Sequence, residues 1–294
     1  MKRKLTGGLA LLLTVGLLLP AAASADSSIN EKLGVPIVVY GANLSEDERA
    51  SVRKSLKVDE EAEVEEIEVT GKDLVTYIKD GDPNARMYSS AKIMRQDAGK
   101  GLVISIVTQD NITQVTPDMY ATAMLTAGIE DAKVDVAAPK KVSGHSALVG
   151  IYKAYEVSGE KLDKERTDVA NDELDVATKL SEKGVDKDKV AELLTDIKQQ
   201  ISNQNPATKE DVEKIIKEQL DKHKIELSDA DRQLLVDLMD RISKLDIDFS
   251  KFSQQLDDMA SKVKDKLGEI DPSFWEKVKE FFSGLAGSIK SIFK

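Results

Sequence analysis

The chain contains no cysteine and only two histidines among its 294 residues. Without cysteine it cannot form disulfides, thiolate zinc sites or a thiol nucleophile, and it cannot carry the lipid-attached cysteine of a bacterial lipoprotein. His223 stands among the charged residues 221–224, where we expect it to be solvated. A Ser-His-Asp triad would therefore have to use His145.

The short motifs that mark several enzyme classes are also missing. The sequence has no Gly-x-Ser-x-Gly elbow, no HExxH, no phosphate-binding loop and no GxGxxG after a strand. Because these motifs are missing, we predict no catalytic residue. We expect neither a metal ion nor an organic cofactor.

One partial metal-binding pattern lies late in the chain. Asp246, Asp248 and Ser250 follow the spacing of a calcium loop. Lys251 stands where the sharp turn requires glycine, and Asp257 replaces the usual glutamate. We therefore predict that this segment binds no calcium.

Residues 1–25 have the pattern of a secretory signal peptide. Three basic residues precede an almost wholly apolar stretch from Leu9 to Leu19, which is shorter than the roughly 20 residues needed to cross a bilayer. Small residues follow Pro20, and we expect cleavage before Asp26. The sequence thus predicts a secreted, extracytoplasmic protein, and export without disulfides indicates a bacterium, most simply a Gram-positive one.

The charge balance is strongly acidic. The formal net charge is −11, and removal of residues 1–25 takes away three positive charges and no negative ones. A field of that sign repels the phosphates of nucleic acids at long range. We expect no nucleic-acid partner.

The organisation of the chain changes near residue 158. Residues 26–158 alternate short β-branched runs with helical patterns and predict a mixed α/β sheet domain, whereas residues 159–270 are helical in pattern. We predict a separate amphipathic C-terminal helix over residues 271–294. The predicted fold class is α+β, an N-terminal mixed sheet followed by a mainly helical region. We expect strands at 36–40, 63–69, 87–96, 102–109 and 133–138.

Several local signals refine this layout. Ser45 and Glu48 have the spacing of a capping box, and Gly128 suits the end of a helix. The acidic strand 63–69 is expected at a sheet edge, where charge blocks unwanted pairing. The glycine-bearing segment 97–101 favours a β-hairpin between the two strands that flank it. Helices are expected to begin at Ser45, Thr70, Thr116 and Ser143.

The helical region carries apolar stripes at helical spacing, and we expect them to pack into a bundle or against the sheet domain. A coil that binds a partner is the alternative interpretation. The stripes consist of Val190, Leu193, Leu194, Ile197 and Ile201; of Val212, Ile215, Ile216 and Leu220; of Leu234, Leu235, Leu238, Met239 and Ile242; and of Phe249, Phe252, Leu256, Met259, Val263 and Leu267.

Two loops are candidates for a ligand site. If the first and fifth strands are parallel, the loops 41–45 and 142–146 both lie at strand carboxyl ends before a helix N-terminus, where α/β sheets bind ligands. Main-chain N–H groups there favour an anionic group. Ordinary caps and tight turns are the alternative interpretation. The candidate anion-binding residues are Gly41, Asn43, Ser45, Ser143, Gly144, His145 and Ser146.

The segment 125–156, LTAGIEDAKVDVAAPKKVSGHSALVGIYKAYE, resembles the YpuA-like family of secreted Gram-positive proteins, a domain of unknown function (DUF 1002). The resemblance extends to the turn 41–45 and to the layout of signal peptide, mixed domain and helical tail. It implies no catalytic or binding residues, because the family has none established. His145 is not a residue that we associate with the family pattern.

The predicted C-terminal helix holds four of the six phenylalanines and the single tryptophan of the chain, and lysines outnumber acidic residues in it. This combination suits a helix that lies on a membrane surface, and docking on the protein's own core is the alternative. The candidate contact residues are Phe274, Trp275, Val278, Phe281, Phe282, Leu285, Ile289 and Phe293.

Three classes of function remain open. A binding or interaction module of the cell envelope explains export, acidity and the amphipathic tail with the fewest assumptions; its partner would be an unknown envelope protein or wall component. A carboxylate-dependent hydrolase of wall polymers needs no local motif. A structural or stress-related secreted protein is the third class.

Truncation of the chain after Ile270 tests the membrane interpretation of the C-terminal helix. If the helix lies on membranes, the truncated chain pellets less with anionic liposomes than the chain that retains residues 271–294, because its apolar and lysine-rich face is gone. Liposome co-sedimentation measures the difference. Equal pelleting of both proteins would remove the membrane interpretation.

Overall fold

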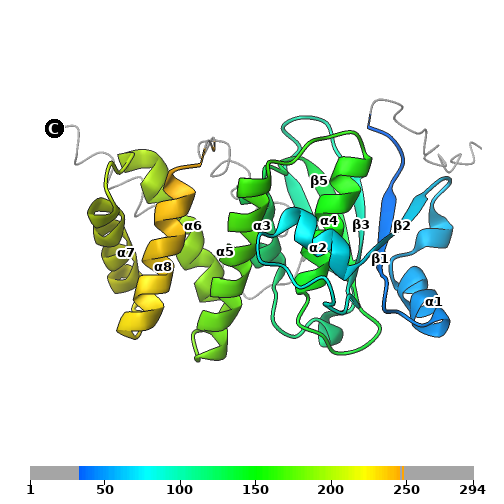
Figure 1. Ribbon diagram of the computed structural model, residues 1–294, viewed down its shortest axis with the longest axis horizontal. Helices are drawn as coiled ribbons and strands as arrows, with labels where there is room; N and C mark the ends of the chain where they lie inside the picture. Colours follow the sequence, from blue (N-terminus) through cyan, green and yellow to red (C-terminus); the bar gives the residue numbers. More distant parts are fainter. Residues whose placement is uncertain (1–32, 246, 248–294) are drawn as a thin grey trace, which may run out of the picture.

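Strands and helices alternate in the first part of the described chain, and the described residues after 158 contain helices but no strand. The computed structural model describes residues 33–245 and residue 247. In this part of the chain a five-stranded mixed sheet precedes a helical region (Figure 1). The predicted α+β class is confirmed.

The sheet has the strand order β2-β1-β3-β5-β4. β3 is antiparallel to β1 and to β5, whereas β2 is parallel to β1 and β4 is parallel to β5. β1 and β5 are consequently parallel, and their carboxyl ends lie at the same edge. β2 is an edge strand, as its acidic sequence predicted. The strands are β1 (Ile37–Gly41), β2 (Glu65–Val69), β3 (Ser90–Arg95), β4 (Leu102–Ile106) and β5 (Ala132–Ala137).

The predicted hairpin between the third and fourth strands is wrong. β3 and β4 do not pair, because β5 lies between them and is hydrogen-bonded to both. Ala132, Val134 and Val136 of β5 are fully buried, which suits a central strand. The segment 97–101 contains a turn, in which the Lys100 N–H donates to the Asp97 carbonyl at 3.1 Å, but it belongs to a connection that passes over the end of β5 and does not join two paired strands.

The helices begin close to the predicted caps. Ser45 forms the expected capping box, Thr116 caps α3, and Gly128 ends α3 in the left-handed conformation. Gly144, one residue after Ser143, occupies the N-cap of α4. The helices are α1 (Glu46–Ser55), α2 (Gly71–Tyr77), α3 (Pro117–Ala127), α4 (His145–Val157), α5 (Lys164–Glu182), α6 (Lys187–Gln204), α7 (Lys209–His223) and α8 (Asp229–Ser243). Two short 3-10 helices lie at Val58–Glu60 and Gln109–Asn111.

One hydrophobic core runs from the sheet into the helical region. α4 packs across β1, β2 and β3, whereas α3 packs against β4 on one side and against α5 and α6 on the other. A second, smaller core lies where α1 covers the opposite face of β1 and includes Val38, Tyr40 and Val52. The helical region thus shares its core with the sheet.

The apolar stripes of α6, α7 and α8 face this core. All of the predicted stripe residues between 190 and 242 are buried except Leu234, which is 37% exposed. For these three helices, packing within the protein is confirmed. The predicted signal peptide, the stripe 249–267, the helix 271–294 and most of the partial calcium loop lie outside the described residues. None of the described helices is both long and apolar enough to cross a membrane.

Candidate functional site

The two loops of the predicted anion site lie at one edge of the sheet and are linked by the chain that leads into β3. The Asn43 N–H donates to the Met87 carbonyl at 3.1 Å, and the Asn43 Oδ1 accepts from the Met87 N–H at 2.7 Å. Two residues farther on, the Ser89 N–H donates to Ser146 Oγ at 3.1 Å. The residues 87–89 therefore bridge the first loop and the start of α4.

The two glycines of these loops lie against the protein's own atoms. A Cβ on Gly41 would come within 2.4 Å of the Met87 carbonyl oxygen. Gly144 has a φ of +109°, and a Cβ there would lie 2.7 Å from Tyr120 Oη, which donates to the Gly144 carbonyl at 2.6 Å. Close packing accounts for both glycines without a ligand.

The main-chain N–H groups of the two loops differ in their hydrogen-bond partners. In the first loop, the Gly41 N–H donates to Ser90 Oγ at 3.2 Å and the Ser45 N–H donates to Glu48 Oε2 at 3.0 Å. The N-terminus of α4 has no side-chain cap and no acidic residue in its first turn, and the His145 N–H lies 3.5 Å from Ser143 Oγ. The anion site stays a prediction.

His145 lies beside two polar side chains of α5. Its Nε2 is 3.2 Å from Asp175 Oδ1 and 3.3 Å from Thr178 Oγ1. A catalytic relay uses opposite ring nitrogens for the nucleophile and the carboxylate, whereas both partners here contact the same nitrogen. The Thr178 hydroxyl also lies 3.0 Å from the Leu174 carbonyl, which it can donate to. This geometry suits a helix-to-helix contact.

The solvated position predicted for His223 is wrong. Its side chain is 8% exposed, and Nε2 lies 2.7 Å from Asp196 Oδ2, which also accepts from Lys222 Nζ at 2.7 Å. The local sequence is charged, but α7 turns this residue towards α6. Both histidines of the chain thus contact a carboxylate on a neighbouring helix.

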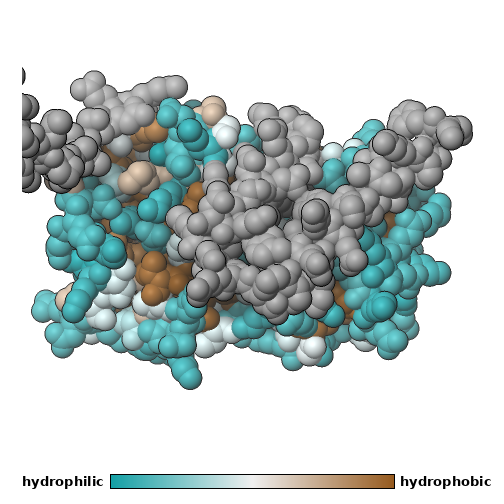
Figure 2. Space-filling view, turned by 180° about the vertical axis from the view of Figure 1, so that it is seen from behind, coloured by the Kyte–Doolittle hydropathy of each residue, from teal (hydrophilic) through white to brown (hydrophobic). Residues whose placement is uncertain are grey.

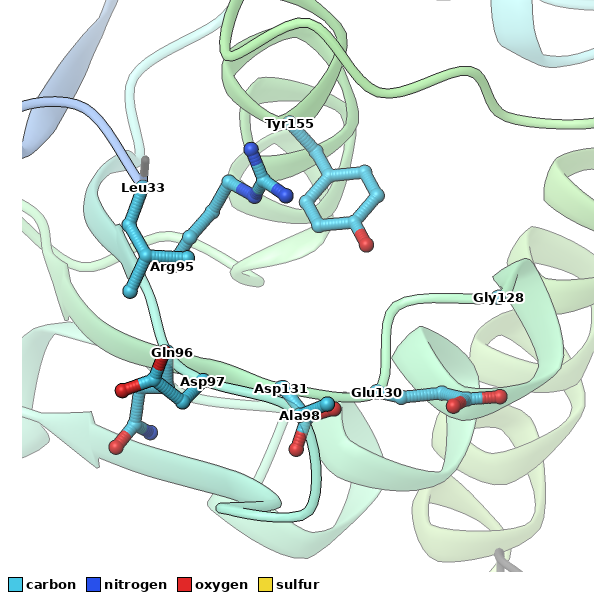
Figure 3. Close-up of a pocket in the computed structure, with 9 residues that line it drawn as sticks. All are labelled: Leu33, Arg95, Gln96, Asp97, Ala98, Gly128, Glu130, Asp131 and Tyr155. Carbon is cyan, nitrogen blue, oxygen red and sulfur yellow. The ribbon is translucent and has the colours of Figure 1, made fainter. Parts of the chain in front are cut away.

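A hollow of about 210 Å³ opens at the opposite edge of the sheet (Figure 3). Its walls come from the end of β3 and the following loop, from the connection between α3 and β5, and from the last turns of α4. The lining residues are Leu33, Arg95, Gln96, Asp97, Ala98, Gly128, Glu130, Asp131 and Tyr155.

Hydrogen bonds between the loops fix the floor of the hollow. The Gln96 N–H donates to the Asp131 carbonyl at 3.0 Å, and Asp131 Oδ1 accepts from the Gly101 N–H at 2.7 Å. Arg95 is held on the far wall, where Nη1 donates to the Ser158 carbonyl at 3.2 Å and Nη2 pairs with Glu160. The hollow is therefore built from ordered, internally bonded walls.

Tyr155 forms one side of the hollow, and its hydroxyl points into the open space (Figure 3). Burial raises the pKa of this phenol, and the carboxylates of Glu160, Glu130 and Asp131 raise it further, whereas Arg95 opposes the shift.

The large hydrophobic side chains that are exposed on the described part of the chain are scattered. Figure 2 shows a face that is mostly hydrophilic where it is described, with small hydrophobic patches. The large hydrophobic residues that are exposed lie on separate elements: Val75, Val107, Val157 and Leu234. Within residues 33–245, no group of three or more histidine, aspartate or glutamate side chains is arranged to hold a metal ion.

A buried polar cluster joins α3, α5 and α6, and we call it the Lys198 cluster: Thr122, Thr126, Glu173 and Lys198. The side chains of Lys198 and Glu173 are 0% and 1% exposed and form an ion pair. Lys198 Nζ also donates to Thr126 Oγ1 at 2.8 Å, and that hydroxyl lies 2.6 Å from Glu173 Oε2. Burial lowers the pKa of Lys198, and the Glu173 carboxylate opposes that shift.

A family model and a known protein both match most of the chain. Residues 40–259 match the family described as "Protein of unknown function (DUF1002)". The chain is 35% identical over 289 residues to the uncharacterized protein YpuA of Bacillus subtilis (strain 168), and the match covers 95% of each chain. No solved structure matches the chain. The family resemblance predicted from residues 125–156 is confirmed.

Substitution of Lys198 tests the energetic role of the Lys198 cluster. Lys198→Met should lower the free energy of unfolding by about 3–5 kcal/mol, because it leaves the Glu173 carboxylate buried without its cation. The double variant Lys198→Met/Glu173→Leu should recover most of that loss, since no buried charge remains. Urea denaturation followed by circular dichroism measures both.

Lys189→Met, on the exposed side of α6, serves as the control and should change stability little. A Lys198→Met variant as stable as this control would contradict the assignment.

Proposed function

The chain belongs to the DUF1002 family, to which no molecular activity is assigned. We propose that this member of the family is an exported binding module of the cell envelope. Export is inferred from the signal-peptide pattern of residues 1–25, which lie outside the described part of the structure. The partner would be a wall component or another envelope protein.

The hollow beside β5 is the observation that carries the proposal. It is concave, it is lined by several charged and polar side chains, and an aromatic ring forms one wall. A few polar groups around a concave space are typical of ligand sites in proteins. The hydrogen bonds between its loops hold these groups in place before any ligand arrives, which reduces the ordering cost of binding.

A carboxylate-dependent hydrolase is the second candidate, because Asp97, Glu130 and Asp131 all line the hollow. Glycoside hydrolysis requires two carboxylates that flank the scissile bond. In Figure 3 the carboxylates of Asp97 and Glu130 point to opposite sides of the hollow, and that of Asp131 accepts a main-chain N–H. This arrangement favours binding over bond cleavage.

A bulky residue in the hollow tests the proposal. Ala98 is exposed and lines the hollow, so Ala98→Trp should fill it without disturbing the core. We expect the protein to co-sediment with insoluble envelope material of the source bacterium and Ala98→Trp to lose most of that binding. Ala50→Trp, at an exposed position of α1, should bind like the unmodified protein.

Three outcomes would contradict the proposal. Equal binding by the two tryptophan variants would remove the hollow as the binding site. Release of soluble sugar or peptide fragments from the envelope material would favour the hydrolase. Failure of the unmodified protein to co-sediment would favour a structural role.

A further inference from the structure

The two edge strands of the sheet differ in charge. β2 has the sequence EEIEV, whereas β4, at the other edge, has the sequence LVISI. Val107 and Thr108 continue β4 without an ionisable group, a proline or a glycine. Folded proteins place charges on edge strands to prevent these strands from pairing with another chain. β2 is protected in this way, and β4 is not.

Alternate residues of β4 direct their main-chain groups away from the sheet. The Val107 N–H donates to the Val136 carbonyl of β5 at 2.9 Å. Because every second residue of a strand faces the same neighbouring strand, the odd-numbered residues of β4 bond to β5. The N–H and C=O groups of Leu102, Ile104 and Ile106 face the other side, where none of the described strands lies. β4 therefore presents a row of strand-type donors and acceptors.

Side-chain burial decreases from β5 to β4. Ile104 lies beside Val134 of β5, on the face that α3 covers; Val134 is fully buried, whereas Ile104 is only partly buried. On the opposite face Val103 and Ser105 are partly exposed, and Val107 is 42% exposed. Both faces of β4 thus keep accessible side chains near the edge.

A second copy of β4 in antiparallel orientation matches this edge. With a twofold axis at Ile104, Leu102 of each copy lies opposite Ile106 of the other, and the two Ile104 residues lie opposite each other. All of the outward main-chain groups of 102–106 then pair, because residues opposite each other in this way exchange both N–H···O bonds. No charged side chain meets its own kind in this strand pair, whereas two β2 strands would bring glutamates together.

We propose that two copies of this chain join at β4 and form one continuous sheet across a twofold axis. The partner is a second copy because the edge is self-complementary and uncharged. The acidity of the rest of the chain opposes contact over a wider surface. Residues 102–106 do not line the hollow, so the dimer leaves the proposed envelope site open.

A contact confined to two strands is smaller than the interfaces of permanent dimers, so the dimer should dissociate on dilution. We expect a Kd between about 1 µM and about 1 mM, measured by sedimentation equilibrium. Ser105→Lys should raise this Kd at least about fivefold, because it places two lysines near the axis of an edge that had no charge. Ser51→Lys adds the same charge at an exposed position of α1 and should leave the Kd unchanged. Circular dichroism checks that both variants are folded.

Added cysteines test the register, because the natural chain contains none. In the proposed pair, Val103 of one copy lies opposite Ser105 of the other in a non-hydrogen-bonded pair, a spacing that suits a disulfide. Oxidation of a mixture of Val103→Cys and Ser105→Cys should therefore give mixed disulfide dimers in high yield. Val103→Cys mixed with Ser51→Cys is the control. Ser51 is the more exposed serine, so random collision would favour the control mixture.

Three results would overturn the dimer. The first is a chain that stays monomeric at about 1 mM, the weak limit of the expected range. The second is a Kd that responds equally to Ser105→Lys and Ser51→Lys, or a mixed-disulfide yield no higher than that of the control mixture. The third is slow hydrogen exchange at the amides of Leu102, Ile104 and Ile106 that does not change with protein concentration, since a single chain would then already cover the edge.

Discussion

The burial of helix α3 between the sheet and the helical region is the constraint on which the rest of the structure depends. Every residue from Met119 to Ala127 is buried, which is possible only because β4 covers one side of the helix and α5 and α6 cover the other. Thr126, Glu173 and Lys198 meet at this contact, one from each of α3, α5 and α6. Because a buried lysine and a buried glutamate must remain paired, the spacing of the three helices is fixed.

The position of α3 also shapes the hollow. Arg166 of α5 donates from Nε to the Thr126 carbonyl at 2.8 Å and from Nη2 to the Leu125 carbonyl at 3.0 Å, which satisfies the last turn of α3. Gly128 follows with a φ of +96°, and its missing Cβ would lie 3.2 Å from the Arg166 guanidinium. The chain then enters β5 through residues 130–131. The hollow thus lies where the sheet meets the helical region, and a residue of α5 holds its rim.

Sequence patterns predicted the local features well and the long-range ones poorly. The caps at Ser45 and Thr116 and the stripe of α6 depend on residues a few positions apart, so their spacing was visible. The insertion of β5 between β3 and β4 depends on pairings between distant residues, such as Ser90 with Ala137 and Leu102 with Ala132, and the glycines of 97–101 suggested a hairpin instead. The hollow was missed because only that insertion brings its loops together. Lys198 was missed because its partner Glu173 lies on another helix, 25 residues away.

Native-state hydrogen exchange tests most directly whether α3 makes the sheet and the helices one cooperative unit. If the shared core is correct, the slowest amides of β5 and of α6 exchange through the same global opening, with equal free energies and equal dependence on denaturant. A set of α6, α7 and α8 amides that opens at clearly lower free energy, while the amides of β5 stay protected, would contradict this account.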